Sequence, residues 1–84
     1  MKIVYSNEAA YLGYEVKNGC LQIESEVFGE HESEKHYLFS VEDSEKIFTL
    51  MTQAQFEDLC KTKYVKGLEA FLEENDIHPK TFTI

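Results

Sequence analysis

The dipeptide Asn18-Gly19, in the middle of the segment YLGYEVKNGCLQIESEVF, is the feature that most restricts how this chain can fold. A two-residue type I′ turn requires positive φ at both central positions, and Asn-Gly is among the pairs that adopt it most readily. Hydrophobic and polar residues alternate on both sides of the dipeptide, which is typical of half-buried strands. The segment therefore predicts a β-hairpin formed by residues 11–17 and 20–28.

The turn also predicts which side chains share a face of the hairpin, because alternate residues of a strand point to the same side. The face expected to join the core carries Leu12, Tyr14, Val16, Leu21, Ile23, Ser25 and Val27. The opposite face carries Tyr11, Glu15, Lys17, Cys20, Gln22, Glu24 and Glu26. One face of the hairpin is therefore expected to be buried, and the other to be wet and acidic.

The segments MKIVY and KHYLFS flank this hairpin and predict one further strand on each side, with GEHESE as the connecting turn. An antiparallel meander of about four strands would result. After Ser40 the hydrophobic period changes from 2 to 3.6, which predicts three short helices that begin near Val41, Gln53 and Val65. Ser40 and Thr52 precede the first two helices as N-cap residues.

The last helix is expected to stop at Asn75 in a left-handed conformation, and Pro79 prevents further helix. The final segment KTFTI is then a short C-terminal extended strand. Strands followed by helices, without a linker or a repeat, predict a single α+β domain over residues 1–84.

The chain has sixteen acidic residues, eight lysines and no arginine, with a formal net charge of -8. Binding of nucleic acid is disfavoured because phosphate contacts need clustered cations, and anionic membranes are disfavoured for the same reason. A basic protein partner fits this charge better. Acidity that serves solubility alone is the alternative. No signal peptide or spanning apolar run is evident, so we expect a cytoplasmic protein with reduced thiols at Cys20 and Cys60.

The octapeptide GEHESEKH, residues 29–36, contains His31 and His36 among three glutamates, which are possible zinc ligands. Zinc needs three or four converging ligands, and a turn between strands does not bring ligands together unless another element contributes. No cysteine lies nearby in the sequence. We therefore expect no metal and no cofactor.

Catalysis has little support in the sequence. Cys60 and a histidine could form a nucleophile and its base, but Cys60 lies on the expected core stripe of its helix. The chain has no glycine-rich phosphate loop and no nucleophile elbow. We expect that the protein is not an enzyme.

Five glutamates lie between Cys20 and Glu34 without an intervening lysine or arginine. Some project from the wet hairpin face, and others extend the acidic strip into the turn. The predicted partner-binding residues are Tyr11, Glu15, Glu24, Glu26, Glu30, Glu32 and Glu34. A merely solvated sheet face is the alternative. A second acidic cluster, Glu73, Glu74 and Asp76, lies at a helix C-terminus, where the helix dipole disfavours acids.

Two long segments, HYLFSVEDSEKIFTLMTQAQFEDLC and GLEAFLEENDIHPKTFTI, carry a resemblance that extends over most of the chain. In size, acidity, order of elements and sequence character, the chain resembles small bacterial immunity proteins of polymorphic or contact-dependent inhibition toxin systems. The resemblance implies a binding protein that neutralises a cognate toxin, often a basic nuclease domain, by occlusion, and it implies no catalytic residue. The alternative is a small cytoplasmic regulatory or housekeeping protein without an inhibitory role.

Overall fold

The computed structural model describes residues 1–29 and 32–84. Within these residues the elements follow the order β1 (Lys2–Ser6), β2 (Ala10–Lys17), β3 (Cys20–Val27), β4 (Ser33–Leu38), α1 (Val41–Leu50), α2 (Gln53–Glu74) and β5 (Lys80–Thr83). The strands form one antiparallel sheet in the order β1-β2-β3-β4-β5. The predicted α+β class is confirmed.

The hairpin of β2 and β3 turns at Asn18 and Gly19, whose φ angles are 54° and 78°. Its register pairs Tyr14 with Ile23 and Leu12 with Ser25, as the sequence predicts. The prediction that Val16 and Val27 join the core is wrong, since their side chains are 53% and 40% exposed. Both valines lie near the ends of the hairpin strands, where fewer side chains pack over them.

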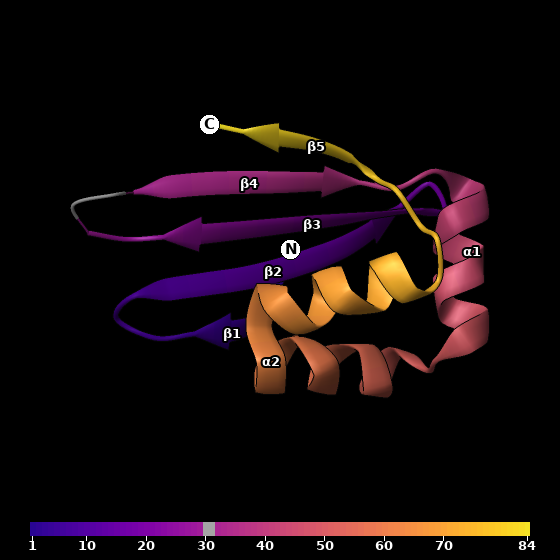
Figure 1. Cartoon of the computed structure of the whole chain (residues 1–84), viewed down its shortest axis with the longest axis horizontal. Coiled ribbons are helices and arrows are strands. Elements are labelled where there is room, and N and C mark those ends of the chain that lie inside the picture. The colour runs from indigo at the N-terminus through magenta and orange to yellow at the C-terminus, as the bar shows by residue number, and fades with distance from the viewer. Residues whose placement is uncertain (30–31) are drawn as a thin grey trace.

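The sheet has five strands among the described residues, where a meander of about four and a separate C-terminal strand were expected. The C-terminal strand β5 returns after the helices and pairs with β4 as the last strand of the sheet (Figure 1). The predicted turn GEHESE is also too long, because β4 already begins at Ser33. Pairing of Glu34 with Glu26 on β3 extends the strand into the segment expected to be a turn.

The prediction of three helices is corrected to two in the described part of the chain, because the second and third are joined in α2. Helix α2 reverses direction at Tyr64, whose φ of 53° and ψ of -147° are not helical (Figure 1). The start expected near Val65 is therefore the second arm of a bent helix. Tyr64 packs against Tyr5 of β1, with ring centroids 4.7 Å apart. The left-handed residue after α2 is Asp76, with φ of 54°, and not Asn75.

The helix N-termini follow the predicted capping. Ser40 accepts a hydrogen bond from the backbone N–H of Asp43, and Thr52 forms a reciprocal capping box with Gln55. These bonds satisfy backbone groups that the first turn of a helix leaves unpaired. The caps therefore define where the chain changes from extended to helical structure.

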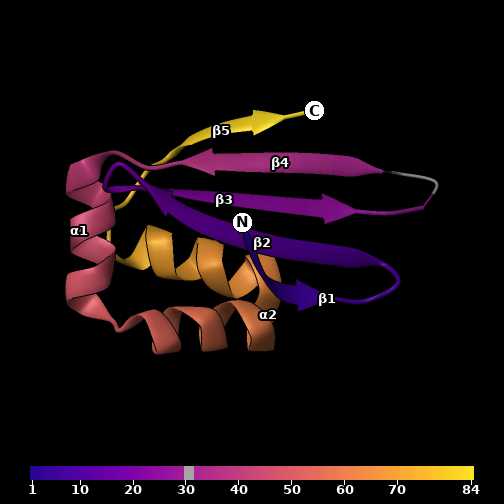
Figure 2. The same cartoon turned by 180° about the vertical axis from the view of Figure 1, so that it is seen from behind.

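The two arms of α2 pack over one face of the sheet, while α1 lies across the strand ends next to the Asn18-Gly19 turn (Figures 1 and 2). The core between these layers contains Val4, Leu12, Tyr14, Leu21, Ile23, Tyr37, Phe39, Ile47, Phe56, Cys60, Leu68, Leu72 and Ile77. In the part of the chain that is described, neither helix has the length and apolar character needed to cross a membrane. The opposite side of the sheet, here called the outer face, is left uncovered by these two helices (Figure 2).

Candidate functional site

The outer face is where the strand register gathers most of the predicted partner-binding residues. Successive side chains of a strand point to opposite faces of the sheet. Because Leu12, Tyr14 and Ile23 are buried, their sequence neighbours lie on the outer face. The predicted residues on this face are Tyr11, Glu15, Glu24, Glu26 and Glu34. Glu32 is exposed just before β4, whereas Glu30 and His31 lie outside the described residues.

Three strands contribute to the acidic part of this face. Glu26 on β3 lies opposite Tyr11 on β2 and opposite Glu34 on β4. Glu24 lies opposite Gly13 and His36 in the next row of the same face. The register therefore concentrates these carboxylates on β3, the middle strand of the sheet, and on its neighbour β4.

Glu15 lies apart from this concentration, in a row where it is opposite Gln22. Its Oε2 atom is 3.9 Å from the N-terminal amino group of Met1. Lys17 and Lys80 also belong to the outer face by register, but Lys17 is the last residue of β2 and Lys80 the first residue of β5. The face thus has an acidic region with lysines displaced to one end.

Tyr11 is half-buried, although the sequence suggested an exposed tyrosine. Its hydroxyl donates a hydrogen bond to Oε1 of Glu24, and its ring centroid lies 6.0 Å from that of Phe28. The hydrogen bond from Tyr11 lowers the pKa of Glu24 below its ordinary value, and it raises the pKa of Tyr11. Glu24 is therefore held in its charged form at neutral pH.

Sequence reasoning missed the apolar side chains beside these acids. A shallow hollow of about 420 Å³ is lined by Met1, Ile3, Ser6, Tyr11, Glu24 and Phe28. Ile3 lies over Gly13, where an added Cβ would be only 2.9 Å from its Cδ1 atom. Ile3 in β1 and Gly13 opposite it could have indicated this apolar hollow from the sequence. Their pairing depends, however, on a β-bulge in β1 that the sequence does not reveal.

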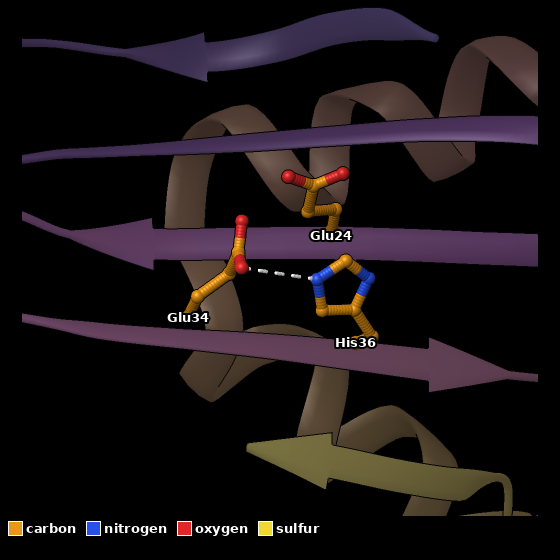
Figure 3. Close-up of side chains that lie close together, drawn as sticks. All are labelled: Glu24, Glu34 and His36. Carbon is orange, nitrogen blue, oxygen red and sulfur yellow. Dashed lines mark ion pairs between the residues drawn. The ribbon is translucent and has the colours of Figure 1, made fainter. Parts of the chain in front are cut away.

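His36 joins two of the acids in a compact cluster on the outer face. One ligand atom from each of Glu24, Glu34 and His36 lies within 4.8 Å of the others. The cluster combines Glu24 from β3 with Glu34 and His36 from β4. Figure 3 shows Glu34 directed at the His36 ring, with the Glu24 carboxylate beside them and turned toward β2. His36 lies in β4, as the predicted strand KHYLFS implies, and the pairing of β4 with β3 places it beside Glu24, so a second element contributes to the cluster.

The two thiols differ sharply in environment. Cys60 is buried in the core, and burial raises its pKa to about 12. A thiol with this pKa remains protonated at neutral pH, which disfavours Cys60 as a nucleophile. Cys20 is half-exposed on the outer face, and both cysteines are free.

The second acidic cluster lies on the other layer of the molecule, at the end of α2. Glu73 and Glu74 are exposed, while Asp76 lies 2.7 Å from Nε2 of His78. Nearby, Lys46 donates a hydrogen bond to the backbone carbonyl of Asn75, which offsets the unfavourable helix end. This cluster is separate from the acids of the outer face.

Comparison with known proteins adds no assignment to this geometry. No protein-family model, no curated protein and no solved structure matches the chain.

Proposed function

We propose that this protein is a binding protein that neutralises a basic protein toxin by occlusion, with the acidic outer face as its contact surface. The observation that carries the proposal is the gathering of Tyr11, Glu24, Glu26 and Glu34 on a sheet face that the described helices leave open. A negative surface attracts a positive partner over a distance and selects it against neutral or negative proteins.

The way charges are paired within the molecule supports binding of a basic side chain from a partner protein. Glu26 and Glu34 lie directly opposite each other, and like charges in this position destabilise a sheet. The ion-paired lysines of the described chain, Lys2 and Lys35, bind glutamates of α2 instead. A basic side chain from a partner would relieve the repulsion that remains between Glu26 and Glu34.

The hollow beside these acids suits the kind of side chain that such a partner would present. Its aliphatic and aromatic walls, Ile3 and Phe28, are 51% and 39% exposed. Lysine and arginine side chains pack their stems on apolar surface and place their charged heads near carboxylates or aromatic rings. Glu24 at the same hollow supplies such a carboxylate. Apolar anchoring and charge attraction thus come from one surface.

The test is a double charge reversal, Glu24→Lys with Glu26→Lys, in the full chain. The partner to use is the toxin candidate encoded by the gene adjacent to this one, with growth rescue measured beside binding kinetics. We expect slower association and a flatter dependence of the association rate on ionic strength, because charges at an interface act mainly on these quantities. Circular dichroism checks that the variant keeps its fold.

The matched control is Glu73→Lys with Glu74→Lys, which changes the net charge equally on exposed positions of α2. This control should bind and protect nearly as well as the unaltered protein. Equal losses of binding in the two double variants would mean that the partner responds only to the net charge of the protein and not to the outer face. Loss of protection in the control alone would move the contact surface to the helices. Normal binding by the Glu24 and Glu26 variant would show that the outer face is merely solvated.

A further inference from the structure

We propose that Glu24, Glu34 and His36 form a binding site for a divalent transition-metal ion of the zinc type. The site is a property of the sheet alone, so it does not depend on the proposed toxin binding. It joins two carboxylates and one imidazole from two paired strands, which are rigid elements with a defined register.

The spacing of the ligand atoms suits one small cation. Zinc binds imidazole nitrogen and carboxylate oxygen at about 2.0–2.2 Å, so tetrahedral ligand atoms lie roughly 3.3–3.6 Å apart. Nε2 of His36 lies 3.4 Å from Oε2 of Glu34, and the third ligand atom, from Glu24, lies within 4.8 Å of both.

The environment of His36 is an independent observation that points to a ligand. Its Nε2 atom is buried and has no hydrogen-bond partner among the residues described. Buried polar atoms in folded proteins are nearly always paired, and exceptions call for an ion, a water molecule or a functional role. Oε2 of Glu34 lies 3.4 Å from this nitrogen without meeting hydrogen-bond geometry, and in the neutral imidazole an unprotonated Nε2 can bind a metal.

The surroundings of the carboxylates also fit a metal site. The Tyr11 hydroxyl binds Oε1 of Glu24, which orients the carboxylate and leaves its other oxygen for a ligand bond. Hydrogen bonds of this kind from outer residues are common around metal ligands and tune their affinity. Two carboxylates would also compensate the charge of a divalent cation.

The donor set indicates the class of metal. An imidazole together with carboxylates favours zinc and other divalent transition ions over magnesium and calcium, which prefer oxygen ligands alone. Three protein ligands leave at least one coordination position, which water or a partner side chain can occupy. The site is therefore expected to bind zinc with an open position.

The experiment is a zinc titration of the full chain by calorimetry, and a cobalt titration followed by its visible absorption spectrum. We expect one zinc ion per chain. The zinc affinity should fall by about tenfold or more in His36→Gln and in Glu34→Gln, since replacing even a residue that only hydrogen-bonds to a metal ligand lowers metal affinity by about 10–100-fold. His31→Gln should bind zinc as the unaltered protein does.

Glu26→Gln is the matched control, because it removes one charge from the same face and lies opposite Glu34 without belonging to the cluster. It should change the zinc affinity only slightly. Equal weakening in Glu26→Gln and Glu34→Gln would overturn the proposal in favour of diffuse attraction to an acidic surface. Absence of zinc binding in the unaltered protein, or its loss in His31→Gln alone, would also overturn it.

Discussion

The hydroxyl of Tyr11 on β2 donates a hydrogen bond to Oε1 of Glu24 on β3, and this bond is the main cause of the lowered pKa of Glu24. Replacing Tyr11→Phe removes the donor and keeps the ring. We expect the pKa of Glu24 to rise toward the ordinary glutamate value, as measured by NMR titration of the side-chain carboxyl carbons. Tyr5→Phe is the control, since the Tyr5 hydroxyl instead accepts a hydrogen bond from Nδ2 of Asn7. An unchanged pKa of Glu24 in Tyr11→Phe would contradict this role.

The turn at Asn18-Gly19 leads to a prediction about stability. Gly19 has a φ of 78°, and its nearest neighbour, Val41, leaves ordinary contact distance for an added Cβ. Gly19→Ala should therefore lower the free energy of unfolding by about 1 kcal/mol through backbone conformation alone. Asn18→Gly should keep the stability nearly unchanged, because glycine adopts positive φ freely. Urea unfolding of both variants gives the comparison, and equal losses would contradict the turn's role.

The hairpin was predictable because its turn chemistry is local, and the registers of Leu12 and Tyr14 follow from it directly. The sequence also predicted a new helical segment near Val65, and α2 is interrupted there, at Tyr64. The reversal of direction was not predictable, because a positive φ at tyrosine depends on its packing against Tyr5, far away in the sequence. The sequence of β4 by itself does not predict that His36 lies opposite Glu24. That neighbourhood exists only once β3 and β4 pair, so the cluster of Glu24, Glu34 and His36 depends on the register of the sheet.

Glu57 on α2 predicts a pH dependence of stability. Hydrogen bonds from Lys2, at 2.8 Å, and from Tyr14, at 2.7 Å, lower the pKa of Glu57. Since its pKa in the folded state lies below the unfolded value of about 4.3, its contribution to stability is present above that pH. The contribution is lost as the pH falls through the folded-state pKa.

Glu57→Gln should therefore lower the free energy of unfolding at pH 7, and the difference from the unaltered protein should shrink when unfolding is measured near pH 3. Glu8→Gln is the control, because it removes a carboxylate from an exposed position between β1 and β2 and leaves the hydrogen bonds of Lys2 and Tyr14 to Glu57 in place. A deficit of Glu57→Gln that stays constant between the two pH values would mean that packing, and not charge, explains its effect.

The two cysteines predict unequal thiol reactivity. With a pKa of about 12, the Cys60 thiol is ionised only to roughly one part in ten thousand at pH 8, and it is also buried in the core. Cys20 is half-exposed, so a thiol reagent such as Ellman's should modify one thiol per native chain quickly and the second only on unfolding. In Cys20→Ser the fast phase should disappear while the slow phase remains. Two thiols that react at one fast rate in the native protein would show that the core around Cys60 opens readily.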